Sequence, residues 1–311
     1  MASFILSLLA RLPLGALQKF GVFAGWLTYA LSPTYRRRLR ANLENALGPT
    51  DAARVWRSAV GETGKQALEL AWMLKRPQAE LVAKMVKVSG WEHVEAAEAK
   101  GGGILFITPH LGCFEITAQY FSTHRPITVL YRAPKKAVLQ PLINAGRSRG
   151  DMHIAPADVG GVRRLIKALR AREAVGMLPD QVPGSGEGAW LPFFGRPAYT
   201  MTLAARLSEV AGVTTIFAWA ERLPHGQGFH LRLRPPLVPL EGDTETRATA
   251  INSLIVSRTI NPNEARSWLA LPPREGGDEF LNPNISATPP KPEGSQPKSG
   301  AAEEEDPNAD E

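Results

Sequence analysis

Short apolar runs and helix-spaced apolar positions alternate through the middle of the chain, from Gly101 to about Pro236. Apolar runs bounded by glycine, proline or polar residues are typical of buried strands, and apolar spacings of three and four are typical of helices. We predict strands at Ile104–Thr108, Ile127–Tyr131, Ala174–Leu178, Val213–Ala220 and Phe229–Arg234. We predict helices at Glu115–Ser122, Ala137–Arg147, Gly161–Arg172, Thr202–Val210 and 244–260. This alternation favours an α/β fold, with a mostly parallel central sheet flanked by helices.

The chain before this core has two parts. Residues 1–35 are largely apolar and run into the basic stretch Tyr35-Arg-Arg-Arg-Leu-Arg40. This order predicts a hydrophobic N-terminal helix that anchors the protein to a membrane, either as a tilted span or in the interface, with its basic flank on the cytoplasmic face. The alternative is an amphipathic helix packed on the body of the protein. Residues 36–100 contain little glycine or proline, and we expect them to form helices that cover the sheet.

Charge is unevenly distributed along the 311 residues, whose formal net charge is +6. From Leu271 onward there are 3 basic and 10 acidic residues, so the part before it carries +13. Residues 271–311 are also rich in Pro, Gly, Ser and Glu, which predicts a disordered acidic tail after a core at 101–262. A basic body suggests a polyanionic partner such as anionic lipid or an acidic carrier protein. We expect no nucleic acid, because no recognised module or aromatic-interleaved basic stripe is present.

The stretch from Gly103 to Glu115 carries the strongest candidate chemistry. A predicted strand ends at Thr108, Pro109 stops it, and Gly112 precedes a predicted helix, so His110 and Glu115 fall at the carboxyl end of a strand. Ligands bind in that crevice in open α/β sheets, and an imidazole beside a carboxylate is suited to removing a proton from a hydroxyl. The chain has three His-x4-acid pairs, but only this one combines strand, break, glycine and helix. We therefore predict a catalytic pair of His110 and Glu115, against the alternative of a structural histidine in a β–α turn.

Further polar residues follow other predicted strands. Asp180 and Gln181 come after Ala174–Leu178, so they too fall at a strand's carboxyl end, where they would hold an arginine or an acceptor hydroxyl. Arg132, Arg147 and Arg149 are candidates for binding phosphate or carboxylate groups or for stabilising an oxyanion, as are backbone N–H groups after His110. A rival mechanism would use Cys113 as a nucleophile. Phe193 and Phe194 would line an acyl channel or belong to the core.

The sequence lacks the motifs that are typical of several classes of enzyme. The chain has no Gly-x-Ser-x-Gly elbow of an α/β-hydrolase and no His-Glu-x-x-His motif. Its single cysteine excludes an intramolecular disulfide and a paired-cysteine metal site.

The ordered motifs resemble the bacterial lipid A late acyltransferases, the lauroyl/myristoyl family within the lysophospholipid acyltransferase superfamily. The resemblance spans residues 1–262 and rests on five motifs: His110-Leu-Gly-Cys-Phe-Glu115, Leu130-Tyr-Arg132, Arg147-Ser-Arg-Gly150, Leu178-Pro-Asp-Gln181 and Pro192-Phe-Phe-Gly195. The chain departs from the family at Cys113-Phe114, where Asn-Trp is usual. It also departs at Asn261–Arg274, which lacks the usual aromatic and basic ending.

The resemblance implies a glycerolipid acyltransferase-like fold at the cytoplasmic face of a bacterial inner membrane, in contact with anionic lipids. It implies an O-acyltransferase of lipopolysaccharide biosynthesis that uses no cofactor. The enzyme would move a fatty acyl chain from acyl carrier protein to a hydroxyl of a lipid A precursor. Two alternatives remain open. One is the same chemistry on another acceptor (a lysophospholipid, an ornithine lipid or a glycolipid), and the other is a non-catalytic lipid-binding relative at the membrane surface.

Overall fold

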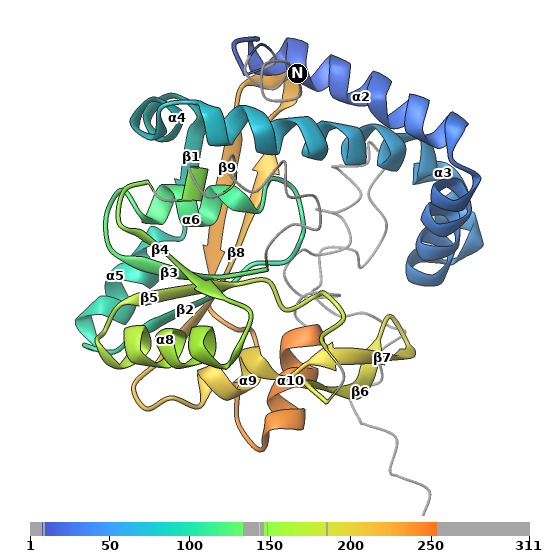
Figure 1. Cartoon of the computed structure of the whole chain (residues 1–311). Helices are drawn as coiled ribbons and strands as arrows, with labels where there is room; N and C mark the ends of the chain where they lie inside the picture. Colours follow the sequence, from blue (N-terminus) through green and yellow to red (C-terminus); the bar gives the residue numbers. More distant parts are fainter. Residues whose placement is uncertain are drawn as a thin grey trace, which may run out of the picture.

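The computed structural model describes residues 8, 10–132, 143, 146–147, 149–184 and 186–253. The predicted acidic tail, most of the predicted helix Ala137–Arg147 and the end of the predicted helix 244–260 lie outside the described residues. Figure 1 shows a central sheet with the helices α2 (Leu14–Leu31) and α3 (Pro33–Lys75) above it in this view, and with α8 (Val159–Arg170), α9 (Leu203–Ser208) and α10 (Thr244–Ser253) below it.

Seven strands form the central sheet in the order β1-β9-β8-β2-β5-β3-β4, and all neighbours are parallel except β8 and β9. The strands are β1 (Val86–Ser89), β2 (Ile104–Ile107), β3 (Ile127–Tyr131), β4 (Met152–Pro156), β5 (Ala174–Met177), β8 (Thr214–Arg222) and β9 (Phe229–Arg234). The mostly parallel sheet between helices confirms the predicted fold class, and the five predicted strands are all present. A separate antiparallel hairpin joins β6 (Gly188–Phe193) to β7 (Arg196–Met201).

Alternate residues of the strands feed two hydrophobic cores on opposite faces of the sheet. Along β2, Ile104 and Phe106 belong to one core, and Leu105 and Ile107 belong to the other. The first core is completed by α2 (Leu14–Leu31), α3 (Pro33–Lys75), α4 (Gln78–Met85), α5 (Trp91–Ala99) and α6 (Glu115–Phe121). The second is completed by α8 (Val159–Arg170), α9 (Leu203–Ser208) and α10 (Thr244–Ser253). Burial on both faces explains why β2 and β5 read as unbroken apolar runs.

The first cover layer differs from the expected all-helical segment at 36–100, because β1 lies within it and pairs with β9. Its Val-Lys-Val-Ser sequence alternates half-buried and exposed positions, which suits a strand at the edge of the sheet. The long helix α3 is also interrupted: Gly48 has φ +76° and Pro49 follows it, so the chain kinks there.

Helices α2 and α3 lie side by side through glycine contacts (Figure 1). A Cβ placed on Gly21 would come 2.7 Å from the Cα of Lys65, and one placed on Gly64 would collide with the backbone of Gly21 and Gly25. Small residues at a helix crossing let two backbones approach closely, so these positions fix how α2 sits on α3. Among the described helices, none combines the length and the apolar character needed to cross a bilayer.

Candidate active site

The turn between β2 and α6 carries His110 and runs beside the end of β8. Gly112 has φ +60°, and a Cβ there would collide with the carbonyl oxygen of Ala220. Cys113 N–H donates to that same oxygen at 2.9 Å, which pairs the turn with β8 in a parallel bridge. Glycine is therefore required at position 112 both for the left-handed backbone and for the close approach to β8.

Asp180 holds His110 at two points. The Nδ1 of His110 lies 2.7 Å from Oδ1 of Asp180, and the backbone N–H of His110 donates to Oδ2 at 2.7 Å. The two residues meet because β2 and β5 are parallel neighbours, so the segments that follow them emerge at the same edge of the sheet. The imidazole stays partly open, with 31% of the side chain exposed.

Gln181 approaches the other ring nitrogen, with its Nε2 3.1 Å from Nε2 of His110. An ionised carboxylate only accepts hydrogen bonds, and an amide nitrogen only donates them. An imidazole with its proton on Nδ1, facing Asp180, and a lone pair on Nε2 satisfies both contacts. His110 therefore presents an acceptor nitrogen at the open side of the turn.

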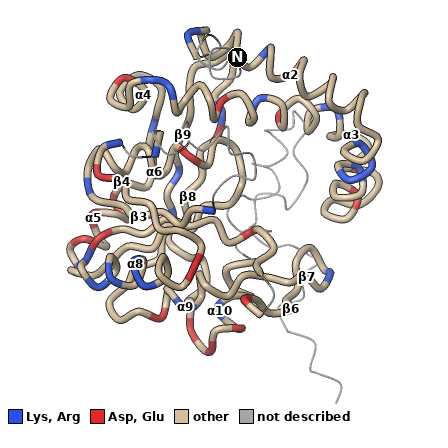
Figure 2. The backbone as a smooth tube through the Cα atoms, in the orientation of Figure 1, with Lys and Arg blue, Asp and Glu red and all other residues tan. Residues whose placement is uncertain are grey.

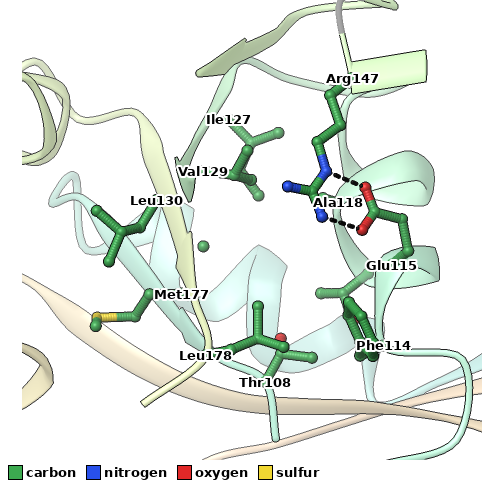
Figure 3. A pocket seen from close by; sticks show the side chains of 12 residues that line it. Thr108, Phe114, Glu115, Ala118, Ile127, Val129, Leu130, Arg147, Met177 and Leu178 are labelled. Carbon is green, nitrogen blue, oxygen red and sulfur yellow. Dashed lines mark hydrogen bonds and ion pairs between the residues drawn. The ribbon is translucent and has the colours of Figure 1, made fainter. Parts of the chain in front are cut away.

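Glu115 is not the carboxylate that holds the imidazole, which corrects the pairing predicted from the sequence. Its two oxygens accept hydrogen bonds from Nε and Nη2 of Arg147, at 2.7 and 2.6 Å (Figure 3). The first turn of α6 directs the Glu115 side chain toward Arg147, whereas the imidazole of His110 faces the segment after β5. His110 and Glu115 share one turn but have different partners.

The pair of Glu115 and Arg147 is closely packed and bidentate. Only 6% of the Glu115 side chain and 16% of the Arg147 side chain are exposed. Burial by itself would lower the pKa of Arg147, but the charge and hydrogen bonds of Glu115 outweigh it, and the pKa lies above its usual value. The guanidinium also lies 5.3 Å from the ring centroid of Tyr131. Arg147 is thus a fixed, permanently charged cation near the turn.

A small pocket opens beside this pair (Figure 3). Glu115 and Arg147 form its polar wall, and apolar side chains from β3 and the end of β5, including Val129, Leu130 and Met177, form the opposite side. Its volume is about 30 Å³, which is room for water but not for a fatty acyl chain.

The other two predicted arginines lie in different surroundings. Arg132 is exposed directly after β3. The guanidinium of Arg149 donates to the backbone carbonyls of Leu74 and Arg76 at the end of α3, and burial lowers its pKa. Arg149 therefore caps α3, a role that its position in the sequence gave no means of predicting.

Cys113 is buried at 5% exposure. Burial, reinforced by the charge of Glu69, raises the pKa of its thiol well above the usual value, although Arg222 opposes the shift. A thiol with a raised pKa is a poor nucleophile, which disfavours the rival mechanism. Phe193 and Phe194 lie at the turn from β6 to β7 with ring centroids 4.8 Å apart.

One further side chain, Arg222, contacts the turn and is held there by Glu69, and neither residue belongs to the sequence motifs. Arg222, at the end of β8, donates to the carbonyl oxygen of Gly112 at 3.3 Å and is held by Glu69 of α3 at 2.6 Å. Their only sequence signal is an arginine and a glutamate placed within apolar stretches. Across the described part of the chain, no three His, Cys, Asp or Glu side chains are grouped so that they could hold a metal ion.

Comparison with known proteins identifies the family. Residues 1–274 match the family model described as bacterial lipid A biosynthesis acyltransferase. The chain is 28% identical over 190 residues to the lipid A biosynthesis lauroyltransferase of Escherichia coli (strain K12), covering 60% of this chain and 61% of that protein. It is 23% identical over 189 residues to the palmitoleoyltransferase of the same organism, with the same coverage.

A lipid A biosynthesis acyltransferase of Haemophilus influenzae (strain ATCC 51907 / DSM 11121 / KW20 / Rd) is 26% identical over 258 residues, which cover 80% of this chain and 81% of that protein. The alignments with the two E. coli enzymes thus span about three fifths of their length. Because the family model spans most of its 311 residues, the chain belongs to the bacterial lipid A biosynthesis acyltransferase family.

Proposed function

We propose that this protein transfers a fatty acyl chain from acyl carrier protein to a hydroxyl group of a lipid A precursor. Family membership supports the reaction class. The observation that carries the proposal is the partly exposed imidazole of His110. Its Nδ1 is hydrogen-bonded to Asp180, so Nε2 faces outward as an acceptor.

In the proposed reaction, Nε2 of His110 takes the proton of the acceptor hydroxyl as its oxygen attacks the thioester carbonyl. The tetrahedral intermediate then collapses, the carbon–sulfur bond breaks, and the imidazolium gives its proton to the departing thiolate of the carrier, which leaves as the thiol. Asp180 stabilises the imidazolium between these steps, as the carboxylate does in a hydrolase triad. A base in hydrogen-bond reach contributes on the order of 10²–10⁴ in rate.

Gln181 would give up its place at Nε2 when the hydroxyl arrives. Its amide already donates to that nitrogen at 3.1 Å, so the hydroxyl replaces one donor with another. We propose that Gln181 then turns to the acceptor oxygen or a neighbouring sugar group. Exchange of this kind leaves no polar atom without a partner, which keeps the cost of binding low.

Glu115 acts in this scheme through Arg147. The carboxylate fixes the guanidinium in one orientation, and the guanidinium supplies positive charge for the thioester oxyanion or for a lipid phosphate. Two of the backbone donors near the base are already in use, because the N–H of His110 donates to Asp180 and the N–H of Cys113 donates to the carbonyl oxygen of Ala220. Arg132, exposed after β3, is proposed to bind acceptor phosphate, whereas Arg149 supports the site through α3.

The acyl chain is proposed to enter along the apolar wall of the pocket in Figure 3. Because the pocket holds only about 30 Å³, the chain needs side chains such as Leu130 and Met177 to move apart. Methionine and leucine have several accessible rotamers, so this opening costs less than displacing a strand would.

Helix α2 is proposed to lie in the cytoplasmic surface of the inner membrane. Phe20, Phe23, Leu27 and Leu31 recur at helical spacing, and each is 48–74% exposed. Arg37, Arg38 and Arg40 follow on the exposed side of α3, where Figure 2 shows Lys and Arg gathered on its first part. An apolar stripe next to a basic cluster suits the interface of an anionic bilayer, which would bring the site to its lipid acceptor.

The reaction is tested with purified protein, labelled acyl-acyl carrier protein and a lipid A precursor, followed by mass spectrometry of the product. We expect one added acyl ester on the lipid A precursor. Acylation of a lysophospholipid, an ornithine lipid or a glycolipid instead would move the proposal to another acceptor. Binding of lipid without transfer to any of them would show a non-catalytic relative.

The membrane proposal has a separate test. Flotation with vesicles containing anionic lipid should bring up the wild-type protein, and Phe23→Ser combined with Leu31→Ser should weaken vesicle binding by at least about tenfold. Val159→Ser is the matched control, because Val159 is 69% exposed on α8, away from α2. Equal flotation of all three proteins would exclude the α2 stripe as the membrane contact.

A further inference from the structure

Arg222 joins three separate parts of the molecule. It is the last residue of β8, and 13% of its side chain is exposed. Its Nε donates to Glu69 at 2.6 Å, its Nη1 donates to Glu62 at 3.1 Å, and its Nη2 donates to the carbonyl oxygen of Gly112 at 3.3 Å. One guanidinium therefore links α3 to the turn that carries His110.

Glu69 extends this chain of contacts to α2. Its side chain is 1% exposed, and its second oxygen accepts from Nε2 of Gln18 at 2.9 Å. Burying a carboxylate is unfavourable unless a cation and hydrogen bonds compensate it, and here Arg222 and Gln18 do so. The contacts thus run without interruption from α2 through α3 and β8 to Gly112.

The turn itself is held from two sides. Asp180 binds His110 on one side, and β8 binds the other through Cys113 N–H and through Arg222. Gly112 carries no side chain that could pack the turn in place, and its left-handed backbone has its own conformational freedom. A carbonyl anchored by a buried, charged donor compensates for that freedom.

We propose that Arg222 is a positioning residue for the turn between β2 and α6, and that Glu69 and Gln18 hold it in place from the α2–α3 layer. Through Gly112, Arg222 sets where His110 and Glu115 lie relative to the substrate. The inference rests on the proposed function only for its effect on turnover, since the placement of the turn is measurable without substrate.

The alternative is that Arg222 and Glu69 merely fasten α3 to the sheet. Loss of the pair would then lower the free energy of unfolding and leave the native turn unchanged. Cys113 separates the two cases, because it lies in the turn, is buried, and is the only cysteine in the 311 residues. Its alkylation rate in the native protein reports how often the turn opens.

The experiment compares wild type with Arg222→Lys and Glu69→Gln, and uses Arg232→Lys as the matched control. Lysine at position 222 keeps the positive charge but lacks the guanidinium group that donates to three partners. Glutamine at position 69 can still accept a hydrogen bond but carries no charge. Arg232 is another sheet arginine paired with a carboxylate, Glu221 at 3.0 Å, and within the described part of the chain no hydrogen bond or ion pair joins it to the turn. Iodoacetamide labelling is followed at 25 °C across low urea concentrations, together with kcat, KM and thermal unfolding.

We expect Arg222→Lys to speed alkylation of Cys113 by at least tenfold, and low urea concentrations should not change that rate. The same variant should lower kcat by about tenfold and leave KM within twofold of the wild-type value. Glu69→Gln should lower kcat by less than Arg222→Lys does, and Arg232→Lys should change neither the labelling rate nor kcat. Labelling in Arg222→Lys that equals wild type, or that rises with urea in step with global unfolding, would overturn the positioning role. An inactive wild type would refute the proposed function alone, because the labelling result still decides the inference.

Discussion

Two pairs that each contain a carboxylate meet at the turn between β2 and α6, and they differ in how far water reaches them. The pair of His110 and Asp180 is partly open, with side-chain exposures of 31% and 15%, and the pair of Arg147 and Glu115 is largely closed, at 16% and 6%. An open pair can exchange one hydrogen-bond partner for a substrate atom. A closed pair cannot do so without leaving a buried charge, so its contribution is a fixed field and a fixed shape.

The largest expected effect comes from the open pair. His110→Ala should lower the rate of acyl transfer by a factor on the order of 10²–10⁴, because the acceptor hydroxyl loses its general base while the fold is retained. His153→Ala is the matched control, since His153 is also followed by an acid at the same spacing but lies exposed on β4. Turnover by purified His110→Ala at the wild-type rate would remove the catalytic proposal.

A double-mutant cycle on kcat/KM tests which carboxylate belongs to which partner. Asp180→Asn should cost about 100-fold, and adding it to His110→Ala should cost almost nothing more, because the pair acts as a unit. Glu115→Gln and Arg147→Gln should be coupled to each other in the same way. Asp180→Asn and Glu115→Gln should add within about 0.5 kcal/mol. Strong coupling between His110 and Glu115 would instead restore the pairing that the sequence predicted.

The pair of Glu115 and Arg147 should contribute to the free energy of unfolding. Glu115→Ala leaves the Arg147 cation buried without its partner, and we expect it to lower the free energy of unfolding by about 3–5 kcal/mol. Replacing both residues, Glu115→Gln with Arg147→Met, should recover much of that loss in urea unfolding. A Glu115→Ala protein as stable as wild type would mean that solvent or another residue compensates Arg147.

The smallest effect is expected at Cys113. Cys113→Ser should keep acyl transfer within about threefold of wild type, because a thiol whose pKa is raised by burial makes no acyl-enzyme. Intact-protein mass spectrometry after mixing with acyl-acyl carrier protein checks this directly. A trapped acyl group on Cys113 would replace the general-base scheme with a covalent one.

The sequence predicts the central strands well because β2 and β5 are buried on both faces and appear as short apolar runs. It misses β1, which alternates polar and apolar residues within a helix-rich stretch, and β4, whose His153 and Pro156 interrupt the apolar pattern. Strands at sheet edges carry a weaker signal because one side is not fully covered.

The sequence indicates which single residues lie at the site better than it indicates which of them contact each other. His110, Glu115, Asp180 and Gln181 all follow strands or begin a helix, which sequence can indicate. His110 pairs with Asp180, 70 positions later, because β2 and β5 are neighbouring strands. The local spacing of residues in the sequence does not indicate which strands are neighbours. The same holds for Arg222 and Glu69, 153 positions apart.

The glycine contact between α2 and α3 limits which helix can take the place of α2. Because Gly21, Gly25 and Gly64 place two backbones against each other, the shape of α2 is matched to that of α3. A chimera carrying an unrelated apolar helix in place of Leu14–Leu31 should pack poorly on α3, unless the small-residue spacing is copied with it. In this protein, α2 and α3 can therefore be exchanged only together.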